Sequence, residues 1–472
     1  MSDELVFASL TELAAMIRSR AVSPVDVVRA TLEHIERIGS ALNCYITIMG
    51  GEAEKEAERL EQLLGEGAYL GPLHGVPISL KDNICTAGTR TTAGSPILEH
   101  WVPDQDATAV QRLKAAGAII IAKANLYEFA FGAPHTRFGP THNPWDLDRS
   151  CAGSSSGSAA AVAAGLCHAS IGTDTGGSIR IPATLCGIVG SKPTYGLVSR
   201  AGVIPVSYNM DHVGPMTRTV PDAAVVLQAM AGPDPKDSTT VPATLPDFLS
   251  IIEDGVQGLR IGILAPQATE AIQPEVREAV RRAYAVFDRE GATLSEVVLP
   301  DLTQARTVNW VICGAEAAEY HRPYLRTRAG DYHPVVRALL EGGEFIPATD
   351  YIHAQRVRRR FTEEVRSALA GVDVLILPAA ALEAYRIGQR TVMLDGLEED
   401  VLQANTRYTP LFDLTGHPAL VLPCGFSSTG LPIGLQVVGK PLDDARVFRV
   451  ARAYERATDW HTRRSRLTAN QA

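Results

Sequence analysis

Residues 152–161 read AGSSSGSAAA, and residues 172–180 read GTDTGGSIR. Glycine adopts backbone conformations that other residues avoid, so both turns can present serine hydroxyls together with backbone amides. Upstream, residues 75–83 read GVPISLKDN, a strand-like alternation that delivers Lys81 to a strand end. Two serines, one lysine and a glycine-lined pocket of donors are the parts of an acyl-transfer enzyme that needs no histidine.

These stretches resemble the motifs of the amidase signature family of serine hydrolases. Two further runs extend the resemblance, KPTYG at residues 192–196 and DHVGP at residues 211–215. The resemblance covers most of the chain, from about Leu10 to Trp460, and is densest over residues 71–220. It implies an α/β fold, a single α/β/α domain in which a large twisted mixed β-sheet is covered by helices on both faces.

The predicted organisation is one amidase domain over residues 1–472. Within it we expect a helical N-terminal region at about residues 8–65, the signature core at about 71–220 and a variable substrate-pocket region at about 300–410. No internal repeat or low-complexity segment divides the chain.

Local patterns predict elements of this fold. Residues 9–12 read SLTE, a capping box that starts a helix, and Ser23-Pro24 supplies a second helix start. Residues 118–122 read AIIIA, which is apolar on both faces, as in a buried strand. A predicted strand at 258–264 followed by a helix at 274–290 repeats the strand–helix alternation of a sheet covered on both faces.

The resemblance carries the family's catalytic residues onto Lys81, Ser154 and Ser178. It implies that Ser178 is the nucleophile and that Ser154, held across a cis peptide bond, relays protons between the other two. A lysine with its ordinary pKa of about 10.4 is protonated at neutral pH and cannot accept a proton. Because burial disfavours the charged form, and because Ile78 and Leu80 precede Lys81, we expect its pKa to be lowered.

The glycine turn around the nucleophile predicts an oxyanion hole, because consecutive backbone amides stabilise negative charge on oxygen. We assign this hole to the amides of Thr175, Gly176, Gly177 and Ser178. Ser155 is expected to assist through hydrogen bonds. Asp174 and Arg180 are expected to hold the turn by a charged contact and not to act on the substrate.

The predicted substrate pocket includes Phe129, Ala130 and Phe131, which lie on the segment that lines the acyl pocket in relatives. No cation is obviously placed to bind a carboxylate, so we expect uncharged acyl groups. The chain departs from the usual family pattern at Ala152 and Ser156, where glycines are common. These two side chains reduce the backbone freedom of the loop around Ser154.

These residues predict a stand-alone amidase that hydrolyses the C–N bond of a small uncharged amide through an acyl-enzyme on Ser178. Esters, anilides and carbamates (urethanes) share the acyl-enzyme route and are expected as further substrates. No cofactor and no metal are expected, and we predict a monomer or homodimer.

Two alternatives remain open. The core also resembles the A subunit of glutamine-dependent tRNA amidotransferases. However, residues 405–410 (NTRYTP) have threonine about where that subunit has an aspartate, and its arginine-bearing, glycine-rich segment is not found between 310 and 400. The second alternative is an α/β-hydrolase-type esterase. There, GSSSG at 153–157 would be a nucleophile elbow with Ser155 attacking and His212 as the base, but a turn-rich stretch precedes it where that motif needs a strand.

Composition excludes several other classes of function. The net charge of −9 and the pI of about 5.8 argue against nucleic acid and anionic membranes as partners. The seven cysteines are scattered without metal-type spacing, which predicts buried reduced thiols. The acidic start predicts no signal peptide, and no apolar run approaches the length of a membrane span, so we expect a cytoplasmic protein.

Overall fold

The computed structural model of the chain describes residues 2–242, 245–265, 271–465 and 467. Its strands are β1 (Tyr45–Ile48), β2 (Pro77–Lys81), β3 (Ile119–Ala124), β4 (His142–Asn143), β5 (Asp146–Ser150), β6 (Ala169–Asp174), β7 (Val189–Lys192), β8 (His212–Thr217), β9 (Arg260–Leu264), β10 (Thr293–Val297), β11 (Val374–Pro378), β12 (Thr391–Leu394), β13 (Leu397–Asp400), β14 (Ala419–Phe426) and β15 (Pro432–Val438). Its α-helices are α1 (Ser2–Phe7), α2 (Leu10–Arg18), α3 (Pro24–Leu42), α4 (Gly50–Gly65), α5 (Thr108–Ala115), α6 (Ser156–Ala163), α7 (Arg180–Cys186), α8 (Val220–Met230), α9 (Pro274–Arg289), α10 (Leu302–Arg328), α11 (Pro334–Gly343), α12 (Ala348–Ala368), α13 (Val401–Asn405), α14 (Pro410–Leu414) and α15 (Asp444–Arg456).

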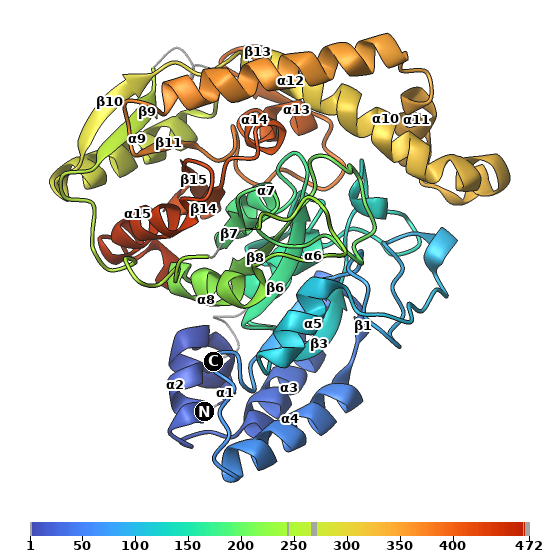
Figure 1. The fold of residues 1–472 in the computed structure, drawn as a ribbon, viewed down its shortest axis with the longest axis vertical. Coiled ribbons are helices and arrows are strands. Elements are labelled where there is room, and N and C mark those ends of the chain that lie inside the picture. Colours follow the sequence, from blue (N-terminus) through green and yellow to red (C-terminus); the bar gives the residue numbers. More distant parts are fainter. Residues whose placement is uncertain (1, 243–244, 266–270, 466, 468–472) are drawn as a thin grey trace.

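A large mixed sheet runs through the molecule (Figure 1). Within the described residues its strands are hydrogen-bonded in the order β1-β3-β2-β6-β8-β7-β14-β15-β11-β9-β10. The strands β3, β2 and β6 are mutually parallel, and β11, β9 and β10 form a second parallel set. The strands between these two sets pair antiparallel. This arrangement confirms the predicted α/β fold with a mixed sheet.

The sheet is buried on both faces because its strands carry apolar residues at odd and even positions. In β3, Ile119 and Ile121 belong to the core around α6 and α7, whereas Ile120 belongs to the larger core that includes α8 and α15. In β14, Val421 and Leu422 divide between the same two cores. Successive side chains of a strand point to opposite faces of the sheet, so each face offers an apolar surface on which a layer of helices packs.

Helix starts follow the local signals in the sequence. The Ser9 side chain accepts a hydrogen bond from the Glu12 amide, and the Glu12 side chain accepts one from the Ser9 amide, so the capping box is confirmed. Pro24 opens α3 after the capping side chain of Ser23. The stretch 140–149, expected to be turn-rich, also contains the short hairpin of β4 and β5, which lies outside the large sheet.

The helices α10, α11 and α12 lie together at one end of the molecule, opposite the N-terminal helices α1 to α4 (Figure 1). They come from the region expected to form the substrate pocket. None of the described helices combines the length and the apolar character that crossing a bilayer requires.

Candidate active site

The candidate site lies at the carboxyl ends of two neighbouring parallel strands. Lys81 is the last residue of β2, and β6 ends at Asp174, directly before the turn of residues 175–178 (TGGS), called the GG turn below. The two strands pair in parallel with Leu80 opposite Ile171, so both strands end at the same edge of the sheet. Ligand sites in α/β sheets form at such carboxyl ends because the loops that follow the strands meet there.

Lys81 is buried, and its ammonium nitrogen is held by hydroxyl groups. Its Nζ lies 2.7 Å from Ser154 Oγ and 2.7 Å from Thr173 Oγ1, and the side chain is fully inaccessible to solvent. Burial lowers the pKa of Lys81 to about 7, although Asp174 and Asp211 act in the opposite direction. Since hydroxyls replace a salt-bridging carboxylate as direct partners, the neutral amine is accessible near neutral pH.

The loop around Ser154 combines a cis Gly153–Ser154 peptide bond with close packing. The cis bond agrees with what the family resemblance implies. A Cβ atom on Gly157 would lie 2.4 Å from the carbonyl oxygen of Cys44, so only glycine fits at that position. Ala152 adopts a left-handed conformation with φ of 55°.

Ser156, the second departure from the family pattern, starts α6. Its hydroxyl lies 3.1 Å from Thr141 Oγ1, within hydrogen-bond distance. Ser156 is thus accommodated by a side-chain partner, whereas Ala152 holds a left-handed conformation that favours glycine.

Ser178 lies half-buried on the turn between β6 and α7 and lines the pocket described below. Its Oγ has no hydrogen-bond partner among the described residues, so the hydroxyl is available to a substrate. Its backbone carbonyl accepts a hydrogen bond from the Ser155 amide at 3.2 Å. Ser154, which contacts Lys81, lines the same pocket.

Asp174 and Arg180 hold this turn in place through buried hydrogen bonds. The Asp174 carboxylate accepts hydrogen bonds from the amides of Gly177 and Ile179 at 2.6 Å and 3.0 Å. Arg180 donates to both carboxylate oxygens of Asp174 at 3.0 Å, and both side chains are fully buried. Burial alone would raise the pKa of Asp174, but the Arg180 guanidinium outweighs burial and holds that pKa below its usual range.

The expected oxyanion hole needs one correction. The Gly177 amide donates to Asp174, so it does not face a substrate oxygen. The amides of Thr175, Gly176 and Ser178 have no acceptor among the residues that the structure describes, and all three residues line the pocket. The set of free donors is therefore three amides and not four.

Two residues that sequence reasoning missed bind the backbone carbonyls of the turn. Asn309 on α10 donates its side-chain amide to the Thr175 carbonyl at 2.9 Å. Thr409 donates its hydroxyl to the Gly176 carbonyl at 2.7 Å. Sequence reasoning assigned neither residue this role, because both come from distant parts of the chain that packing brings to the turn.

We expect Asn309→Ala to lower kcat/KM by about tenfold to 100-fold. The variant loses the hydrogen bond to the Thr175 carbonyl, so the amides of the 175–178 turn are no longer held in the direction of the oxyanion. The loss should fall mainly on kcat, and affinity for a boronate transition-state analogue should fall with it. The control is Thr327→Ala, which removes a polar side chain near the far end of the same helix. Unchanged analogue affinity in Asn309→Ala would contradict a positioning role.

The pocket in front of Ser178 has a volume of about 450 Å³. Ala130 and Phe131 line it, and the Phe131 ring stacks on Trp310 with centroids 5.5 Å apart. Phe129 does not: it is 1% exposed and packs edge-on against His321 in a separate core cluster. Its left-handed backbone, with φ of 49°, turns the side chain away from the pocket, so its assignment to the pocket is wrong.

The pocket wall is mostly apolar or neutral, with one exception. Arg306 on α10 is the single charged residue among the described residues that line it. The expectation that no cation faces the pocket is therefore wrong. No sequence signal marks this position, because Arg306 lies in a helix without a recognisable motif.

The geometry also bears on the nucleophile elbow. Ser155 is fully buried, donates its hydroxyl to the Thr173 carbonyl at 3.2 Å and does not line the pocket. His212 is buried too, with Nδ1 lying 3.3 Å from the Asp174 carbonyl oxygen, and burial lowers its pKa well below the ordinary value. Neither side chain is placed to act on a substrate in the pocket.

Side chains that commonly bind metals are dispersed over the described structure. Among the described residues, no group of three or more His, Cys, Asp or Glu side chains could hold a metal ion. All seven cysteines are free and buried, as their apolar surroundings predicted.

Comparison with known proteins identifies the family of the chain. A family model described as Amidase matches residues 26–448. The chain belongs to the amidase signature family of enzymes, which act on C–N bonds. It is 40% identical to the A subunit of the glutamyl-tRNA(Gln) amidotransferase of Geobacter sp. (strain M21), over 98% of this chain and all of that one.

Solved structures agree on the fold. A chain from a vestigial protein complex, connected with the evolutionary origins of an s-triazine catabolic enzyme, superposes with a TM-score of 0.91 at 33% identity, covering 98% of this chain and 100% of that chain. The peptide amidase of Stenotrophomonas maltophilia superposes with a TM-score of 0.84 at 32% identity, covering 96% and 97% of the two chains.

Proposed function

We propose that this protein hydrolyses the C–N bond of a small amide through a covalent acyl-enzyme on Ser178. The observation that carries the proposal is the buried Lys81, whose Nζ lies 2.7 Å from Ser154 Oγ beside the pocket that contains Ser178. A lysine with a pKa of about 7 can act as both base and acid at physiological pH.

The proposed reaction proceeds in two halves. Neutral Lys81 takes a proton from Ser154 as Ser154 takes one from Ser178, and Ser178 Oγ forms a bond to the substrate carbonyl carbon. The free amides of the 175–178 turn stabilise the oxyanion. Proton return through Ser154 lets the C–N bond break and the amine leave, because an unprotonated amine anion is a very poor leaving group. A water molecule then repeats the attack and releases the acid.

The relay requires one adjustment on substrate binding. Ser178 Oγ has no hydrogen-bond partner among the described residues, so the contact with Ser154 has to form with substrate in place. Catalytic hydrogen bonds commonly tighten only in the Michaelis complex. Esters, anilides and carbamates present the same carbonyl carbon to Ser178, and we include them among the proposed substrates.

A second candidate function is that of an amidotransferase A subunit, which the names of the curated relatives favour over a stand-alone amidase. Pocket chemistry favours the stand-alone enzyme. The described lining contains no carboxylate to bind the ammonium group of glutamine. The segment 405–410, where that subunit has an aspartate, contributes neutral Asn405 and Thr406 to the pocket lining.

The deciding experiment compares substrates on the purified chain alone. We expect hydrolysis of aliphatic amides and aryl anilides without any partner, with glutamine a poorer substrate because its ammonium group lacks a carboxylate partner in the pocket. Ser178→Ala protein, prepared in the same way, is the control for contaminating amidases. Activity confined to glutamine, and dependent on the added partner subunits of an amidotransferase, would establish the second function instead.

A further inference from the structure

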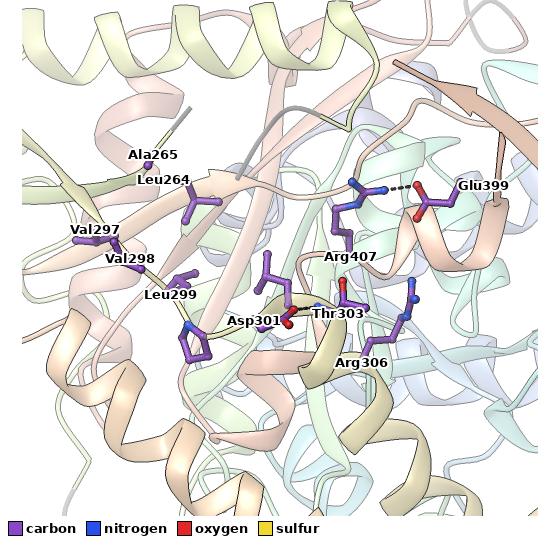
Figure 2. A pocket seen from close by; sticks show the side chains of 12 residues that line it. Leu264, Ala265, Val297, Val298, Leu299, Asp301, Thr303, Arg306, Glu399 and Arg407 are labelled. Carbon is purple, nitrogen blue, oxygen red and sulfur yellow. Dashed lines mark hydrogen bonds and ion pairs between the residues drawn. The ribbon is translucent and has the colours of Figure 1, made fainter. Parts of the chain in front are cut away.

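Arg306 stands on the wall between two cavities. It lines the pocket that contains Ser178, and it also lines an adjoining cavity of about 570 Å³. Figure 2 shows this second cavity with an apolar end around Leu264 and Val297 and a polar end at which Arg306 and Arg407 lie. A substrate that extends beyond the first pocket therefore meets the Arg306 side chain.

The Arg306 guanidinium is held in place without being neutralised. It donates to the backbone carbonyl of Gln403 at 3.2 Å and to Gln403 Oε1 at 3.1 Å. No carboxylate among the described residues forms an ion pair with it. A guanidinium has five N–H donors, so two hydrogen bonds to one neutral residue leave donors for a ligand.

The neighbouring charges do not cancel this cation. Arg407 forms an ion pair with Glu399, as the dashed line in Figure 2 shows. Asp301 uses its carboxylate to cap α10, accepting from the Thr303 amide at 2.8 Å. These three groups are engaged with partners, which leaves Arg306 as the available charge where the two cavities meet.

We propose that Arg306 binds a carboxylate of the substrate, so that the preferred amides carry an anionic group remote from the scissile bond. The inference rests on the proposed amide hydrolysis and specifies its substrate class. Arginine suits this role because its planar fork matches a carboxylate with two parallel hydrogen bonds. The mostly apolar wall around Phe131 and Trp310 accommodates the chain between the carboxylate and the amide.

Binding to Ser178→Ala protein tests this inference without turnover. The ligands are succinamic, adipamic and suberamic acids, each compared by calorimetry with the neutral amide of the same chain length. We expect at least one acid to bind about tenfold to 100-fold more tightly than its neutral partner, which is typical for a hydrogen bond to a charged group. The acid of best fit reports the span from Ser178 to Arg306.

The decisive variant combines Arg306→Gln with Ser178→Ala. It should abolish the preference for the acid, because the acid loses a charged partner that the neutral amide does not have. Arg326→Gln, an exposed arginine on the same helix that lines neither cavity, should keep the preference. Equal or weaker binding of all the acids, or a preference that survives in Arg306→Gln, would overturn the inference.

Turnover separates this inference from the function on which it rests. If wild-type protein hydrolyses each of the three acids no better than the neutral amide of the same chain length, the carboxylate site is wrong and the amidase proposal stands. If the acid binds through Arg306 but no amide is hydrolysed, the binding site stands and the amidase proposal fails.

Discussion

Ser178→Ala is expected to reduce amide hydrolysis by about 10⁴-fold or more, because residues that act as one catalytic unit fail together when the nucleophile is lost. Ser178 is the half-buried serine of the GG turn, and its hydroxyl faces the pocket without a partner among the described residues. The measurement is kcat/KM on an aryl anilide. Ser158→Ala is the matched control, because its buried hydroxyl has no hydrogen-bond partner in the part of the chain that the structure describes and lies outside the pocket.

Covalent labelling distinguishes Ser178 from the other serines of the site. A fluorophosphonate should modify Ser178 in native protein, and mass spectrometry of the digested protein should locate the adduct there. Ser155 should remain unmodified, since it is fully buried and bonded to the Thr173 carbonyl. An adduct on Ser155 would instead support the nucleophile elbow.

The second large effect concerns Lys81 and pH. The base is active when it is deprotonated, and burial lowers the pKa of Lys81 to about 7. We therefore expect kcat/KM to rise as pH increases through about 7 and to level off above it. Burial also raises the pKa of Asp211 to about 6, and this carboxylate accepts a hydrogen bond from the Thr175 hydroxyl. We therefore expect a second, smaller rise of kcat/KM near pH 6, because ionised Asp211 helps to hold the 175–178 turn.

Lys81→Ala should remove the limb near pH 7 and reduce anilide hydrolysis by several powers of ten. The loss on a nitrophenyl ester should be smaller, since nitrophenolate leaves without a proton. Lys81→Arg should fail as well, because arginine stays protonated and cannot act as a base. Lys192→Met removes another buried lysine, which lies outside the pocket, and should leave the position of the limb unchanged. Equal losses on both substrates would reduce Lys81 to a structural role.

Sequence patterns predicted the parts of the fold and site that depend on local chemistry. The apolar run of β3 and the capping box of α2 require only neighbouring residues, and both are confirmed. The motifs also placed Lys81, Ser154 and the 175–178 turn near one another, although their catalytic roles remain predictions.

The errors share a physical cause. Phe129 follows a backbone that turns into the left-handed region, which apolar composition does not signal. The loss of the Gly177 amide follows from an acceptor, Asp174, that becomes visible only once the turn closes around it. Arg306 and Asn309 reach the site because α10 packs against it, and such long-range packing leaves no mark in a single sequence.

The buried guanidinium of Arg180 has a consequence for how this scaffold tolerates change. Besides Asp174, it bonds to Asp413 on α14, to Gln436 on β15 and to the Thr409 carbonyl, so one side chain links the 175–178 turn to the C-terminal part of the chain. Arg306 and Leu402, by contrast, reach the pocket from helices nearer the surface. Exchanging Arg306 or Leu402 is therefore expected to change which substrates fit the pocket, while the contacts of Arg180 keep the 175–178 turn in place.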